Sequence, residues 1–190
     1  MTDKHAIIVS GVRRSGKDTL ITLLHGLDSR FERFSFADRL KEDLISLLGD
    51  QFNIDPFNCS EEQKELVRPI LIAYGCAWRE VNKNHWVELV IERAQFRQRV
   101  MSDMIVAVSD GRFTNEIKAF RDFYGKNLFH IDVSRTDGPP PTEEEERNFR
   151  QVQEMADYKL VWGNDSMSAR IEKATMIYNW LLENGLPKNS

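Results

Sequence analysis

A glycine-bounded segment near the N-terminus has the residue types that hold a polyphosphate. It reads Gly-Val-Arg-Arg-Ser-Gly-Lys-Asp-Thr over residues 11–19 and follows the apolar run at 6–10. Gly11 and Gly16 can adopt backbone angles that other residues avoid, so successive N–H groups can turn inward around a phosphate. A helix beginning near Lys17 would add its positive end, and the ammonium group would reach the β- and γ-phosphates. This order predicts a nucleoside triphosphate site; the alternative is a chance glycine–lysine turn.

The residue after the lysine departs from the usual phosphate-loop pattern, which has serine or threonine there. The chain has Asp18 at that position and Thr19 next. Either could handle the magnesium ion that accompanies ATP, because Mg²⁺ accepts carboxylate and hydroxyl oxygens. Arg13 and Arg14 could flank the γ-phosphate or point to solvent. The loop therefore predicts ATP and Mg²⁺ as cofactors.

Further charged side chains follow predicted strands, where ligands bind in parallel sheets. Asp110 and Arg112 come directly after the apolar run 104–108. The carboxylate could order magnesium-bound water and the guanidinium could face an acceptor phosphate, or the pair could form an ordinary turn. Asp38 follows another predicted strand, and it could cap a helix, receive a proton or position the acceptor.

Three basic side chains in the predicted helical region could hold that acceptor. Lys41 shares a helix face with Asp38, three residues earlier. Arg68 and Arg79 bracket the apolar stretch 69–78. If that helix packs over the cleft, both arginines could bind a monophosphate; otherwise they are surface residues.

Apolar runs alternate with amphipathic stretches along the chain, which is typical of βαβ units around a parallel sheet. We predict a three-layer α/β/α fold with a central five-stranded parallel sheet, its strands at 6–10, 31–37, 104–108, 128–133 and 158–162. Helices are predicted from near residue 17, at 38–48, 60–73, 84–100 and 114–124, and finally to near 183. Gly49 and Gly75 mark the ends of the second and third of these helices, and Ser60 with Gln63 forms a capping-box pattern at the start of the third. The segment 135–147, with three prolines and four glutamates, predicts an exposed flap before a polar helix.

Length and composition limit the partners that we expect. A chain of 190 residues suits one domain, and its net charge of −4 argues against a nucleic-acid partner. No apolar stretch approaches the roughly 20 residues of a membrane span. Cys59 and Cys76 form neither a disulfide framework nor a metal motif, which indicates a reducing cytoplasm.

The loop, with aspartate in place of serine or threonine, resembles that of the deoxynucleoside monophosphate kinases of tailed bacteriophages. Segments 34–44, 68–90, 106–121 and 157–173 are similar to further blocks of that family, in the same order. The matching positions are Ala37, Leu40, Lys41, Arg68, Leu71, Gly75, Trp86, Val87, Asp110, Arg112, Glu116, Asp157, Asn164 and Asp165.

The resemblance implies a P-loop kinase fold and transfer of the γ-phosphoryl group of ATP to a nucleoside or deoxynucleoside monophosphate. The ATP site would comprise Gly11, Arg13, Arg14, Ser15, Gly16, Lys17, Asp18 and Thr19, with Asn164 near the adenine. The catalytic groups would be Lys17, Arg14, Arg112, Asp110 and Asp38. The acceptor would contact Asp38, Lys41, Arg68, Arg79 and Arg112, and the metal would lie near Asp18 and Asp110.

In the same assignment, region 38–100 binds the acceptor and region 135–150 acts as a lid. Ile72 and Cys76 replace the family's usual glutamine and threonine, which leaves the accepted base open. Because related kinases share the Ser-Gly-Lys-Asp loop, phosphomevalonate or dephospho-coenzyme A is an alternative acceptor. A module that binds ATP without catalysis is a third possibility. The oligomeric state stays open, a homodimer included.

Overall fold

Five parallel strands form one sheet in the order β2-β3-β1-β4-β5. A computed structural model describes residues 4–136 and 143–189, without the side chains of 143–148. The strands are β1 (Ala6–Ser10), β2 (Phe31–Phe34), β3 (Ile105–Gly111), β4 (Leu128–Arg135) and β5 (Tyr158–Trp162). This topology confirms the predicted five-stranded parallel sheet.

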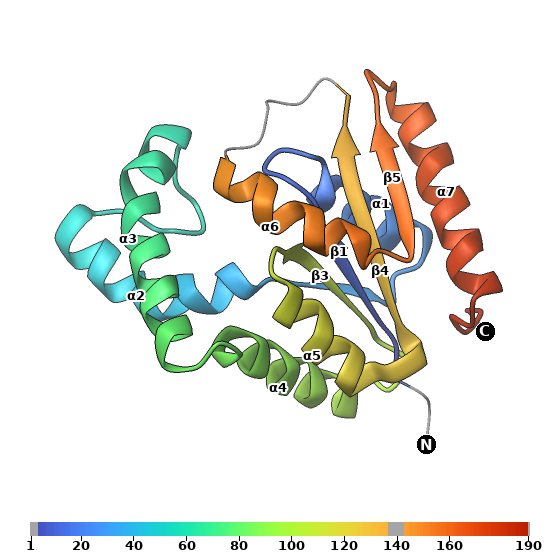
Figure 1. The fold of residues 1–190 in the computed structure, drawn as a ribbon, viewed down its shortest axis with the longest axis horizontal. Helices are drawn as coiled ribbons and strands as arrows, with labels where there is room; N and C mark the ends of the chain where they lie inside the picture. Colours follow the sequence, from blue (N-terminus) through green and yellow to red (C-terminus); the bar gives the residue numbers. More distant parts are fainter. Residues whose placement is uncertain (1–3, 137–142, 190) are drawn as a thin grey trace.

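Helices connect successive strands and form the outer layers (Figure 1). They are α1 (Lys17–Leu27), α2 (Phe36–Phe52), α3 (Glu61–Val81), α4 (His85–Val100), α5 (Thr114–Tyr124), α6 (Glu143–Glu154) and α7 (Met167–Glu183), with a short 3₁₀ turn η1 (Gly125–Asn127). Figure 1 shows α2 and α3 projecting beyond the sheet on one side. No helix among the described residues is long and apolar enough to span a membrane.

Two apolar cores lie on opposite faces of the sheet, because successive side chains of a strand point to opposite sides. In β1, Ile8 packs in the core with α2, α4 and α5, whereas Ile7 and Val9 pack in the core with α1 and α7. The central strands β1 and β3 are buried on both faces, which explains their continuous apolar runs. The three-layer α/β/α prediction is therefore confirmed.

The start of α2 differs from the prediction. Strand β2 ends at Phe34, so the predicted strand 31–37 is too long, and Ser35 caps a helix that begins at Phe36. Asp38 therefore lies in the first turn of α2 and is not its N-cap. The N-cap prediction for Asp38 is wrong because the Ser35 hydroxyl already accepts the N–H of Ala37.

Two helices continue past the glycines at which the sequence predicted their ends. Helix α2 continues through Gly49 to Phe52 and ends at Asn53, whose φ of 51° is left-handed. Helix α3 continues through Gly75 to Val81, past its predicted end. A side chain at Gly75 would lie 2.8 Å from Leu40 Cδ1, so this glycine permits close packing between α3 and α2.

The remaining boundaries agree to within a few residues, with two extensions. Strand β3 continues to Gly111 and β4 to Arg135, beyond their predicted ends at 108 and 133. The Ser60 capping box at the start of α3 is confirmed. Of the predicted flap, residues 137–142 lie outside the described residues, and the polar helix after it is α6.

Candidate phosphate-binding and acceptor site

The loop between β1 and α1 has the backbone conformation of an anion-binding nest. Gly11, Arg14 and Gly16 have φ angles of 141°, 61° and 94°. Alternation of such residues with ordinary ones turns successive N–H groups toward one point. Gly16 is also the N-cap of α1, and no side chain caps that helix. The N–H groups of the first turn are therefore placed to bind an anion.

Lys17 is buried, and its ammonium group stabilises the loop. Its Nζ donates hydrogen bonds to the carbonyl oxygens of Gly11 and Val12, at 2.8 and 2.7 Å, and lies 3.4 Å from the Ser15 hydroxyl. Burial and, to a smaller extent, the positive charge of Arg112 lower the pKa of Lys17 to about 8. A phosphate entering the nest would meet an ammonium group already held at its edge.

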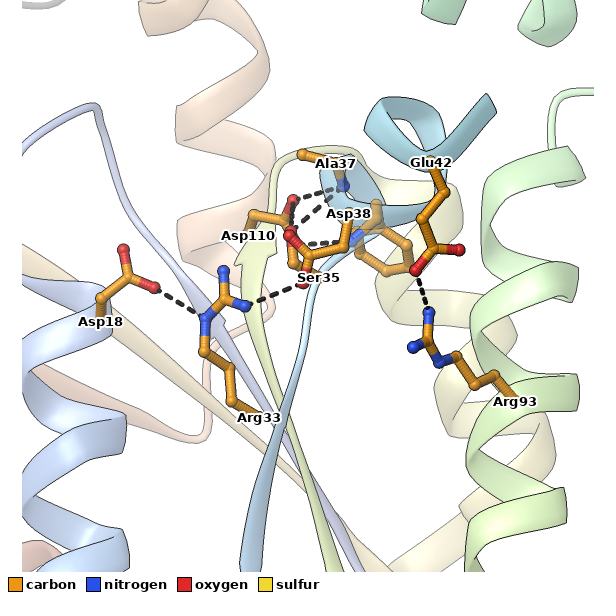
Figure 2. A network of polar contacts seen from close by, with 9 residues as sticks. Asp18, Arg33, Ser35, Ala37, Asp38, Glu42, Arg93 and Asp110 are labelled. Carbon is orange, nitrogen blue, oxygen red and sulfur yellow. Dashed lines mark hydrogen bonds and ion pairs between the residues drawn. The ribbon is translucent and has the colours of Figure 1, made fainter. Parts of the chain in front are cut away.

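Asp110 holds the start of α2. Its carboxylate accepts hydrogen bonds from the Ser35 hydroxyl at 2.8 Å and from the N–H groups of Phe36 and Ala37 at 2.9 and 3.0 Å (Figure 2). A carboxylate at the N-terminus of a helix is favourably placed in the helix dipole. Asp110 thus ties the end of β3 to the start of α2. Its action on magnesium-bound water stays a prediction.

Arg33, which sequence reasoning missed, lies between two predicted site residues. Its Nε donates to Asp18 Oδ1 at 3.2 Å, and its Nη1 donates to Asp38 Oδ2 at 2.8 Å. Figure 2 shows this guanidinium between the first turn of α1 and the first turn of α2. Arg33 therefore connects the predicted donor and acceptor regions.

A magnesium ion fits this arrangement only as a partner of the nucleotide. Among the described residues, no cluster of three or more His, Cys, Asp or Glu side chains could hold a metal. Mg²⁺ in such sites takes most of its ligands from phosphates and water and needs one or two protein oxygens. The Asp18 side chain, 72% exposed, and the adjacent Thr19 hydroxyl fit that requirement.

Two arginines of the loop and one arginine of α3 form ion pairs with two glutamates of α3. Arg13 pairs with Glu65 at 2.6 Å, Arg14 lies 3.5 Å from Glu61, and Arg68 pairs with Glu65 at 3.1 Å. These pairs are solvent-exposed, and exposed pairs contribute only about 0–1 kcal/mol. A bound polyphosphate could therefore take these arginines from the glutamates.

Glu116 connects the guanidinium of Arg79 with the backbone of Arg112. The guanidinium of Arg79 lies 4.6 Å from the centre of the Phe113 ring and 3.9 Å from Glu116 Oε1. Glu116 Oε2 accepts the N–H groups of Arg112 and Phe113 at 2.7 and 3.0 Å. Arg112 is exposed and lies close enough to Lys17 to lower its pKa.

Two predicted residues lie outside these contacts. The ammonium group of Lys41 lies 5.2 Å from the centre of the Phe57 ring. Asn164 is exposed between β5 and α7. Neither forms an ion pair with another predicted site residue in the described part of the chain, so their roles stay predictions.

A cleft of about 610 Å³ opens between β2, α2 and α4 and adjoins this site. Arg33 and Asp38 line it, but no residue of the 11–19 loop does. An ion pair of 2.6 Å between Arg93 and Glu42 joins α4 to α2 at this cleft (Figure 2). The cleft therefore lies beside the predicted acceptor region, and no residue of the predicted phosphate loop lines it.

Comparison with known proteins places the fold. No family model matches the sequence, and a search of curated proteins found no significant match. Among solved structures, a dephospho-CoA kinase from Campylobacter jejuni is similar with a TM-score of 0.54 and 13% identity, over 95% of this chain and 98% of that one.

Two further structures cover almost the whole chain. A putative kinase from Chloroflexus aurantiacus has a TM-score of 0.51 and 13% identity, over 97% of this chain and 99% of that one. A sugar kinase from Janibacter has a TM-score of 0.50 and 11% identity, over 98% and 99%. At such identities the similarity establishes the fold, which is an α/β fold of the P-loop kinase type.

Proposed function

We propose that this protein is a kinase that transfers the γ-phosphoryl group of ATP to a small metabolite. The observation that carries this proposal is the loop of residues 11–19, whose positive-φ residues allow an anion nest and whose carbonyl groups accept hydrogen bonds from the buried Lys17. The P-loop kinase type of fold supports it. So does the position of Arg112, within electrostatic reach of Lys17.

Phosphoryl transfer needs positive charge and alignment more than covalent help. The loop N–H groups and Lys17 would bind the β- and γ-phosphates. An oxygen of the acceptor would attack the γ-phosphorus, and the bond to the β–γ bridging oxygen would break to release ADP. When bound, Mg²⁺ would supply further neutralisation of these phosphates, held by Asp18 or Thr19. Arg112 and Arg79 would bind the acceptor's own phosphate and align it.

Two classes of acceptor are candidates. The ordered sequence blocks support a nucleoside or deoxynucleoside monophosphate. The structural comparisons favour another phosphorylated metabolite, such as dephospho-coenzyme A, because one similar structure is a dephospho-CoA kinase. An acceptor that attacks through a hydroxyl needs a proton acceptor, and Asp38 in the first turn of α2 is the candidate.

An acceptor panel tests the proposal. ADP formation from ATP is measured with nucleoside monophosphates, phosphomevalonate and dephospho-coenzyme A, and acceptors are ranked by kcat/KM. We expect turnover to rise well above ATP hydrolysis with one of these classes. If none of them raises ADP formation, the kinase proposal fails.

The Lys17→Ala variant separates a catalyst from a module that only binds ATP. In a kinase, this substitution abolishes acceptor-dependent turnover and affects folding modestly. An unchanged rate would show that the chemistry, if any, takes place elsewhere.

A further inference from the structure

Glu116 is a buried acid that lies between two arginines of the candidate acceptor site. The residue is 2% exposed. One carboxylate oxygen accepts two backbone N–H groups, from Arg112 and Phe113. The other oxygen lies 3.9 Å from Nη2 of Arg79. A single side chain thus contacts the guanidinium of Arg79 and the backbone of Arg112.

Two groups restrain the guanidinium of Arg79. Its guanidinium lies over the Phe113 ring, at 4.6 Å from the centre, and faces Glu116. Its Nη1 lies 3.3 Å from the position that a Cβ atom at residue 75 would occupy. The absence of a side chain at Gly75 therefore leaves room for the guanidinium. A restrained guanidinium loses little conformational entropy when it binds an anion.

Helix capping explains the hydrogen bonds to one carboxylate oxygen of Glu116, but it does not explain why the other oxygen lies near Arg79. Glu116 occupies the third position of α5, from which an acidic side chain commonly reaches back to the N-terminal N–H groups. An uncharged glutamine would accept the same two hydrogen bonds. The negative charge is costly to bury, and capping alone does not require it. The negative charge of Glu116 attracts the guanidinium of Arg79.

We infer that Glu116 is a positioning residue of the acceptor subsite, holding Arg79 with one oxygen and the backbone of Arg112 and Phe113 with the other. The guanidinium of Arg79 is thereby held beside the backbone of Arg112, and Arg112 itself lies within electrostatic reach of Lys17. Such a pair suits an acceptor that presents a phosphate group of its own. This inference rests on the proposed function and specifies how that site recognises its acceptor.

The Glu116→Gln variant tests the inference, because it keeps the capping geometry and removes the charge. At about pH 7.5, where most of the Glu116 carboxyl is ionised, we expect the KM for the acceptor to rise about tenfold. The KM for ATP should stay within about twofold, and the protein should remain folded. A rise in both KM values, or no change in the acceptor KM, would overturn the inference.

A double-mutant cycle distinguishes positioning from general support of the fold. If Glu116 acts through Arg79, the E116Q substitution has little further effect in an R79Q background. If the two effects multiply, Glu116 does not act through Arg79 and the inference fails.

Asp157→Asn is the matched control. Asp157 likewise accepts a backbone N–H, from His130 at 2.7 Å, and pairs with an arginine, Arg121, at 2.9 Å. It lies near the opposite end of α5, so both KM values should stay within about twofold of the wild type. An acceptor KM that rises as much in this control as in E116Q would overturn the inference.

Two further experiments apply if E116Q does not fold or if the wild type has no kinase activity. If E116Q does not fold, Glu116→Asp keeps the charge on a shorter side chain that cannot keep both contacts, and the same acceptor-specific rise is expected. If the wild type phosphorylates no acceptor, the proposed function fails. The inference is then tested by binding of inorganic phosphate to the ADP-saturated protein. Equal affinity of wild type and E116Q would overturn it.

Discussion

The packing of the phosphate loop against β5 makes Gly16→Ala a severe substitution. Gly16 has a φ of 94°, and a Cβ there would lie 2.7 and 2.8 Å from Nε1 and Cδ1 of Trp162. Trp162 is 2% exposed, so its ring can move only by disturbing the core beneath α1 and α7. The left-handed backbone costs an alanine about 1–2 kcal/mol, and overpacking adds about 1–3 kcal/mol.

We therefore expect Gly16→Ala to lower the free energy of unfolding by about 2–5 kcal/mol. The matched control is Gly49→Ala, which lies in α2 with no heavy atom within 4 Å of the new Cβ. Because alanine favours the helix, this control should raise the stability by about 0.5–1 kcal/mol. Urea unfolding of both variants, with linear extrapolation to water, measures the difference.

Binding of an ATP analogue tests whether the loss of stability in Gly16→Ala comes from a distorted loop. In Gly16→Ala, the affinity for an unreactive ATP analogue should fall as well, because the nest of N–H groups is distorted. In Gly49→Ala, that affinity should not change. Equal stabilities for the two variants would show that the loop does not pack on Trp162, and the reasoning about Gly16 would be refuted.

Three further predictions concern charges near the site. The pKa of Lys17 falls from 10.5 to about 8 on burial, so wild-type stability should rise by up to about 3 kcal/mol between pH 8 and 10.5; a Lys17→Met variant that keeps this rise would refute it. Burial raises the pKa of Glu116 from 4.5 to about 7, so stability should fall by up to about 3 kcal/mol as the pH rises from 4.5 to 7; the decrease should be absent in E116Q. Arg33→Gln leaves Asp18 and Asp38 without their shared cation, so binding of an unreactive ATP analogue should need a lower Mg²⁺ concentration than in the wild type, and an unchanged Mg²⁺ dependence in calorimetry would contradict this.

The parts of the fold that local sequence controls were predictable. Strand β1 and the loop after it follow from a continuous apolar run and two glycines, and β5 and the end of α7 lie where their patterns placed them. Ser60 and Gln63 specify the start of α3 because a capping box involves only neighbouring residues.

The parts that depend on distant contacts were not predictable from one sequence. Helix α2 begins at Phe36 because Asp110, which lies more than 70 residues later, accepts its first N–H groups. Gly75 suggests a helix end in the sequence, but it lies inside α3, where the absence of a side chain leaves room for Leu40 of α2. Arg33 gave no local signal, since its role depends on two acids contributed by α1 and α2.

The central claim is that the loop at the end of β1 binds the triphosphate of ATP with Lys17. Isothermal titration of an unreactive ATP analogue and Mg²⁺ into the wild type and the Lys17→Met variant tests it most directly. We predict saturable 1:1 binding to the wild type and at least about tenfold weaker binding to the variant, the scale of a lost charge-assisted hydrogen bond. Equal affinities, or no binding by a folded wild-type protein, would contradict the claim.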